Sequence, residues 1–305
     1  MARQEQGQEQ GVGGGRRRTG CGRAPLVACG SGRASALPFV LDTTRRLLAL
    51  DAGLGARVAV HAVDEAFRSV PQLSAGQGTP CAADGERLAA LAELSEVAGW
   101  ILFDAGRHRR AHRANARALS LAELCGDRWT ARLTLLNHSM LQAHVDRPRA
   151  ALAAASRVPG PRPLPARVGT LVLIRQAHAV AMLGGSSAAT DLLAQARSRF
   201  LDGVSRTDPA WAWWIDETEL LGHQGWVLAR LRHWGHAVPL LHRAATATAG
   251  PAYRGLFAAH LLAAYAGAGA WRDAEQLVGE LAPRIADTAS ARTAESLGAT
   301  ALRHR

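Results

Sequence analysis

Residues 91–127 read LAELSEVAGWILFDAGRHRRAHRANARALSLAELCGD, and they decide the fold expected of this chain. Gly99 lies on a small-residue face and Gly106 supplies a turn, while Ala111 and Ala118 follow Gly99 at successive intervals of twelve and seven residues. Two antiparallel helices joined by a tight turn approach closely only where the residues at their crossing are small. The stretch therefore predicts a helical hairpin whose second helix also accepts the next hairpin.

The same spacing of small residues recurs along the chain. It is repeated by Ala177, Ala189 and Ala196, with Gly184 in the turn, and by Gly225, Ala237 and Ala244. One alanine of each second helix marks the units: Ala111, Ala150, Ala189, Ala237 and Ala274, at steps of 39, 39, 48 and 37 residues. The longest step contains an insertion, LDGVSRTDPAWAWW, and Val145 stands where a turn glycine belongs in the second unit. Such a period indicates a stack of about five helix pairs.

Residues that end and begin helices support this division. Gly126 ends one helix, and Asp127, Asp146 and Asp208 are expected to accept hydrogen bonds at the starts of the helices that follow. Gly250 with Pro251 is expected to close another helix. The fold class predicted is all-α, a right-handed superhelix of antiparallel helix pairs.

The chain divides into a tail and one repeat domain. Residues 1–36 are rich in Gly and Arg with no apolar period, so we expect a disordered tail. Residues 37–305 form the helical domain: 37–85 hold two N-terminal helices and a flexible joint, 86–282 the five repeats, and 283–305 a capping helix. The N-terminal helices are expected to break at Gly53 and Gly55 and to pack on the first repeat.

Composition limits the class of protein. The net charge is +11, and all 36 basic residues are Arg, a usage typical of GC-rich genomes such as those of actinobacteria. A polyanionic partner and solvated helix faces both remain open as explanations of that charge. No uninterrupted apolar run is long enough for a membrane span. Four scattered cysteines without a CxxC pair fit a reducing cytoplasm, so we expect a cytoplasmic protein.

The tail has two functional interpretations besides an idle one. Arg16 to Arg18 before Cys29 has the outline of a lipoprotein signal, but Arg23 breaks its short apolar segment. Its Arg and Gly residues also suit weak, sequence-independent contact with nucleic acid phosphates. An inert tail, or an upstream stretch included by the wrong start codon, is the simplest interpretation.

Three segments carry a resemblance to a known family. Residues 99–127, 135–152 and 208–241 resemble the C-terminal region of actinobacterial helix-turn-helix (Xre-type) transcriptional regulators, which consists of tetratricopeptide-like (TPR-like) repeats. The resemblance runs from about residue 40 to the C-terminus. It implies a TPR-like α-α superhelix that senses a ligand or partner and sets the oligomeric state. Residues 1–36 are too short and too polar for a helix-turn-helix, so direct DNA binding by this chain is not expected.

A stack of helix pairs lines its concave groove with side chains of the first helices. The residues expected there are Glu96, Trp100, Phe103, Arg132, Leu135, Ser139, Gln142, Ile174, His178, Glu219 and Trp226. Tryptophan mixed with Arg, Gln and Glu suits an extended peptide or a small organic ligand. Ordinary packing is the alternative role for each of them.

Other candidate sites are weaker. Trp211 and Trp214 share a helix face while Trp213 points elsewhere; core packing is the leading interpretation, and one of the three is a candidate surface platform for a ligand or a second subunit. His108 and His112 are spaced as a metal pair but have no further ligand in the sequence, so no metal or other cofactor is predicted. A phosphate loop, GxSxG, HExxH and a dinucleotide glycine pattern are absent from the sequence in usable form, and we expect no enzymatic activity.

The sequence thus favours a regulatory module that binds a peptide, a protein or a small effector within transcriptional regulation, with a homodimer as an open possibility. A stand-alone interaction scaffold is the second hypothesis. The third is a DNA-binding regulator whose helix-turn-helix is missing from this chain.

Overall fold

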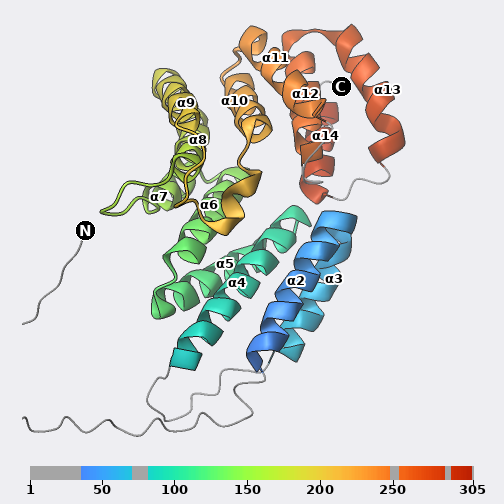
Figure 1. Cartoon of the computed structure of the whole chain (residues 1–305). Helices are drawn as coiled ribbons and strands as arrows, with labels where there is room; N and C mark the ends of the chain where they lie inside the picture. The colour runs from blue at the N-terminus through green and yellow to red at the C-terminus, as the bar shows by residue number, and fades with distance from the viewer. Residues whose placement is uncertain (1–35, 71–81, 248–253, 286–289, 304–305) are drawn as a thin grey trace, which may run out of the picture.

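The computed structural model describes residues 36–70, 82–247, 254–285 and 290–303, and throughout these ranges the chain is helical, with short connections and no strand (Figure 1). The all-α prediction is confirmed. The elements, in chain order, are α2 (Ala36–Leu54), α3 (Ala56–Ser69), α4 (Ala82–Asp104), α5 (His108–Cys125), α6 (Arg128–His144), α7 (Pro148–Ser156), α8 (Ala166–Met182), α9 (Ser186–Leu201), the 3₁₀ helix η1 (Ala210–Trp214), α10 (Glu217–Arg230), α11 (Trp234–Ala245), α12 (Gly255–Ala268), α13 (Trp271–Ile285) and α14 (Ala291–Arg303). The predicted tail falls outside the described residues, except for Ala36, the first residue of α2.

Consecutive helices pack in pairs. The main pairs are α4 with α5, α6 with α7, α8 with α9, and α10 with α11, and α11 also packs closely on α12. The first helices of the pairs also contact one another in succession, from α4 through α6, α8 and α10 to α12. The first helices therefore form one continuous inner wall, and the second helices lie outside it.

The small residues lie at the helix crossings, as the sequence predicts. Ala111, Ala118 and Ala189 have no exposed surface. A Cβ added to Gly225 would lie 2.7 Å from Leu241 Cγ and 3.1 Å from the carbonyl oxygen of Ala237, so the second helix leaves no room for a larger residue. Close backbone approach is therefore what pairs α10 with α11.

The marker of the second unit was displaced by one residue. Ala151, with no exposed surface, lies at the crossing and Ala150 is exposed, so the steps become 40, 38, 48 and 37 residues. The turn residue of this unit is Asp146, with a φ of 57°, and not Val145. Aspartate tolerates this left-handed conformation because its short side chain can bond locally.

The predicted caps are correct at one of the three aspartates. Asp127 accepts hydrogen bonds from the backbone N–H groups of Trp129 and Thr130 at the start of α6. The N-cap of α7 is Arg147 without a side-chain bond, because Asp146 occupies the turn instead. Asp208 accepts from the N–H of Ser205 and does not cap η1. The predicted closure at Gly250 lies outside the described residues.

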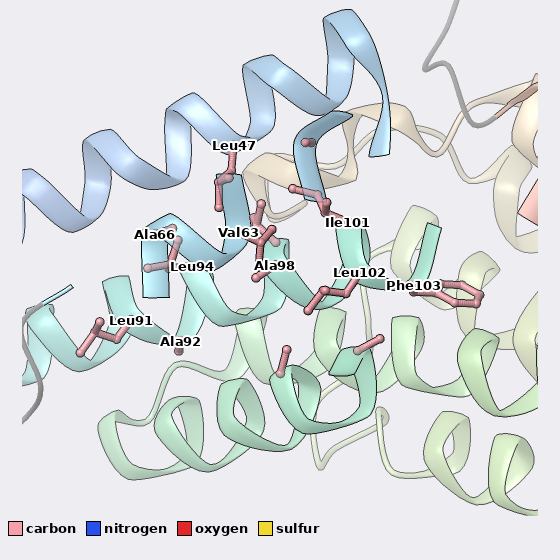
Figure 2. Close-up of a cluster of buried hydrophobic side chains, with 14 of the residues drawn as sticks. Leu47, Val63, Ala66, Leu91, Ala92, Leu94, Ala98, Ile101, Leu102 and Phe103 are labelled. Atoms are coloured by element: carbon pink, nitrogen blue, oxygen red, sulfur yellow. The ribbon is translucent and has the colours of Figure 1, made fainter. Parts of the chain in front are cut away.

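The helices α2 and α3 pack on the first pair. Leu47 of α2 and Val63 of α3 are buried with Leu94 and Ile101 of α4 in one apolar cluster (Figure 2). The break between α2 and α3 falls at Gly55, with a φ of 74°, whereas Gly53 lies within α2. Residues 82–85 of the predicted joint form the first turn of α4, and 71–81 lie outside the described residues.

The insertion before α10 packs on the middle of the stack. Trp211 and Trp214 in η1 lie against an apolar cluster that includes Leu136 and Leu171. Trp213 is 67% exposed. Trp213 is thus the exposed member of the three, and the segment is a 3₁₀ helix.

The C-terminal helix lies on the last pair, and it also reaches the first pair. It packs on α12 (Figure 1). Ser290 Oγ, just before α14, donates to Asp104 Oδ1 at 2.8 Å, and Arg292 Nε, in the first turn of α14, donates to the same oxygen at 2.6 Å. Asp104 ends α4, so α14 spans the inner side from the last pair to the first. In the described residues, no helix combines the length and apolar character needed to cross a bilayer.

Gly225→Ala tests the close crossing. We expect a loss of about 1–3 kcal/mol in the free energy of unfolding, because the added methyl group meets Leu241 and the backbone of α11. Gly279→Ala in α13 is the matched control: nothing lies within 4 Å of its added Cβ, and we expect a gain of about 0.5–1 kcal/mol. Urea unfolding measures both, and a neutral Gly225→Ala would contradict the crossing.

Candidate functional site

Polar and aromatic side chains recur at fixed positions on the inner wall, counted back from the start of each second helix. We call these positions the polar register. Eleven residues before the second helix of a pair stand Asn137, Arg175, His223 and His260, and eight residues before it stand Trp100, Met140, His178 and Trp226. Sequence analysis missed Asn137, Arg175, His223 and His260. Counting back from the turn would have found them, since every pair places this position on the same inner face.

A buried network connects α8 and α10. His223 Nε2 lies 3.0 Å from Glu219 Oε1, and its Nδ1 lies 3.0 Å from His178 Nε2. Arg175 Nη1 approaches His223 Nε2 to 3.2 Å. Arg254 reaches Glu219 Oε2 at 3.7 Å from the start of α12. These contacts join α8, α10 and the start of α12 through buried polar side chains.

The buried histidines of this network are neutral at pH 7. Burial lowers the pKa of His178, His223 and His260 well below the ordinary value. Neighbouring charges, among them those of Arg175 beside His223, act in the same direction. A neutral imidazole donates one hydrogen bond and accepts one, which suits a fixed network.

Trp226 lies between two of these histidines. Its ring stacks on His260 with centroids 4.1 Å apart and planes at 19°, and it meets His178 edge to face at 4.3 Å. The indole is partly exposed on its remaining side. It therefore forms a fixed aromatic surface on the inner wall.

The C-terminal helix covers the other end of the wall. The guanidinium carbon of Arg292 lies 4.9 Å from the Trp100 ring centroid and 4.5 Å from that of Phe103. Phe103 is 1% exposed and Arg292 is 2% exposed. The rings of Trp100 and Phe103, which were predicted to line a groove, thus face α14.

The predicted residues of α4 and α6 contact protein atoms. Asn137 Nδ2 donates to Glu96 Oε1 at 2.6 Å, and burial raises the pKa of this carboxyl to about 7. Ser139 Oγ donates to the Ala151 carbonyl oxygen at a helix crossing. Gln142 Nε2 lies 3.0 Å from His138 Nε2. Each polar side chain is therefore already engaged within the protein.

The remaining residues predicted for the groove, Arg132, Leu135 and Ile174, also contact protein atoms. Arg132 Nε donates to the Val158 carbonyl oxygen, and its guanidinium lies over the Trp129 ring at 4.7 Å. Leu135 and Ile174 are buried in apolar clusters.

A cavity of about 1000 Å³ lies where α6, α10, α12 and α14 meet. Its lining combines aromatic and apolar surface with three arginines and one acid: Ala143, His144, Trp226, Ala229, Arg230, Arg232, Trp234, Leu256, His260, Ala263, Gly267, Arg292, Glu295, Ser296, Ala299 and Thr300. Trp226 is the predicted groove residue that lines it, while His178 and Glu219 lie in the buried network behind. Because Arg292 is paired with Asp104, the lining leaves Arg230 and Arg232 against the single acid Glu295, which is a net positive charge.

No protein-family model matches the chain, and no curated protein matches it.

The buried pair of Asp104 and Arg292 makes a first prediction for the site. Arg292→Met removes the cation and leaves the carboxylate buried, so we expect a loss of about 3–5 kcal/mol in the free energy of unfolding. Adding Asp104→Asn should recover most of that loss, because an amide needs no counter-ion. Urea unfolding measures the free energy of unfolding of the single and the double variant. If both variants lose the same amount, the ion pair does not hold α14 in place.

Glu96→Gln should make the protein more stable at pH 8. Between the ordinary pKa of 4.5 and about 7, the folded state keeps a proton that the unfolded state has lost, so stability falls as pH rises through this window. Glutamine preserves the acceptor for Asn137, and the variant should gain about 1–3 kcal/mol at pH 8 and almost nothing at pH 4. A gain of the same size at both pH values would contradict a neutral Glu96.

Proposed function

We propose that this chain is a non-enzymatic, TPR-like binding module whose cavity takes a small organic anion with an aromatic or apolar body. The observation that carries the proposal is the cavity itself: its volume of about 1000 Å³ lies at the upper end of the range of small-molecule sites. An acidic group would meet Arg230 and Arg232, and the body of the ligand would lie on Trp226 and Trp234.

The position of α14 favours a small effector over an extended peptide. This helix occupies the inner side next to α12 and contacts α4 through Arg292. A long peptide would have to displace it, whereas a compact ligand fits the space that remains. A peptide ending in a free carboxylate shares the required acidic group, and the experiment separates the two.

The buried acid and histidines support binding rather than catalysis. Glu219, His223 and His178 bond to one another and are nearly unexposed. Groups so fully engaged give rigidity to the wall behind Trp226. They have no exposed face from which to exchange a proton with a substrate.

The TPR-like character of the fold, the place within transcriptional regulation and a regulator's oligomeric state are parts of the same proposal. They are supported by the stacked helix pairs with small residues at their crossings, and by the resemblance of residues 99–127, 135–152 and 208–241 to regulator sequences.

Thermal unfolding with panels of organic acids and of short peptides tests the proposal. A ligand that binds only the folded protein raises the melting temperature by mass action, and the stabilisation grows with the ratio of the free ligand concentration to Kd. For the wild-type protein, we expect aromatic or acyl carboxylates to raise it and their amides to fail.

The variant Arg230→Gln with Arg232→Asn should need at least about tenfold more ligand for the same shift, because each arginine offers charge-assisted hydrogen bonds. Asparagine is chosen at 232 because this residue has a φ of 63°. Arg109→Gln with Arg113→Gln, two exposed residues of α5, removes the same charge as a control. If organic acids raise the melting temperature of both double variants equally, the cavity is not the binding site. If peptides raise it and organic acids do not, the ligand is not a small effector.

A further inference from the structure

Three potential metal ligands from three different helices meet at one edge of the cavity. His108 is the first residue of α5, His144 is the last residue of α6, and Glu295 lies in α14. One ligand atom of each lies within 4.8 Å of those of the other two. His144 Nε2 and Glu295 Oε2 are 3.0 Å apart.

The two imidazoles are held by their surroundings. Their ring centroids are 5.0 Å apart with the planes at 68°, and Phe103 lies against both at 6.1 Å and 5.4 Å. The Nε2 atom of His108 is buried and has no hydrogen-bond partner. A buried polar atom left without a partner costs free energy, and a ligand bound to this nitrogen would remove that cost.

The carboxylate of Glu295 is positioned by the first turn. A Cβ added to Gly106 would come within 3.1 Å of Glu295 Oε1, so the glycine lets the carboxylate lie directly against the turn before His108. The turn glycine thus serves two purposes, since its φ of 72° also lies in the left-handed region that favours glycine.

Arg292, a positive charge close to the cluster, is paired with Asp104. Arg292 precedes Glu295 by one helical turn, and its Nε bonds to Asp104 at 2.6 Å. Its guanidinium also lies over the Trp100 and Phe103 rings and reaches Met140 Sδ at 3.2 Å. The carboxylate of Asp104 offsets this charge, so the cluster retains Glu295 as the counter-charge for a cation.

We infer that His108, His144 and Glu295 form a binding site for a divalent transition-metal ion of the Zn²⁺ type. Two imidazole nitrogens and one carboxylate oxygen are a ligand set that Zn²⁺ takes in tetrahedral sites with one open position. Bonds of about 2.0–2.2 Å place such donors about 3.3 Å apart, which small side-chain rotations would achieve from the present separations.

Two consequences follow for the protein. The ion would join α14 to α5 and α6, so it would fasten the C-terminal helix to the first two repeats. Its open position would face the cavity, because His144 and Glu295 both line it. The metal site does not depend on the proposed anion site, which uses Arg230 and Arg232.

The test uses the full chain without an affinity tag, stripped with a chelator and dialysed. Titration with ZnCl₂ by calorimetry should give one equivalent bound, and Zn²⁺ should raise the melting temperature. Titration with CoCl₂ should give the intense visible absorption of tetrahedral Co²⁺, which adventitious surface binding does not produce.

Glu295→Gln keeps the shape of the side chain and removes one ligand charge from an exposed position, so the fold should persist. Together with His144→Gln, it should weaken Zn²⁺ binding at least about a hundredfold and abolish the visible band. His236→Gln on the exposed surface of α11 is the control and should bind as the wild type does.

Unchanged affinity in Glu295→Gln and His144→Gln, or loss of binding in His236→Gln alone, would overturn the site, as would an octahedral Co²⁺ spectrum in the wild type. If His144→Gln unfolds, His108→Gln replaces it. The anion experiment has a separate outcome, since Arg230 and Arg232 can be altered without touching these three ligands.

Discussion

Close approach of paired helices is the constraint on which this structure depends. At the crossing of α10 and α11, an added methyl group on Gly225 would meet both a side chain and the backbone of α11. Buried alanines serve the same purpose in the other pairs. Because each pair is narrow, successive first helices come into contact with one another. The inner wall and its polar register are consequences of that spacing.

The second determinant is a long-range charge pair. Asp104 and Arg292 are 188 residues apart in the chain and almost fully buried, and burying two charges is costly unless both are well bonded. Here Ser290 also donates to the carboxylate, and two aromatic rings lie under the guanidinium. These contacts offset the desolvation and place α14 on the inner side. An open groove thereby becomes a bounded cavity.

The sequence could predict what local spacing determines. Small residues at recurring intervals identified the helix pairs, and Gly106 and Gly184 identified two turns. It misplaced the second unit by one residue because Asp146, and not a glycine, takes the left-handed turn conformation there. It did not predict that Phe103 would face Arg292, since that contact depends on where a distant helix docks. A pattern of small residues contains no information about that docking.

The buried network explains how an exposed aromatic surface can be rigid. Trp226 is held between His178 and His260, and His178 is bonded through His223 to Glu219. An indole fixed in this way loses little conformational freedom when a ligand stacks on it, so less of the interaction energy is spent on ordering. Arg230 and Arg232 are exposed, and water weakens the ion pairs that exposed arginines form. Affinity should therefore come chiefly from the aromatic contact, and selectivity for an anion from the arginines.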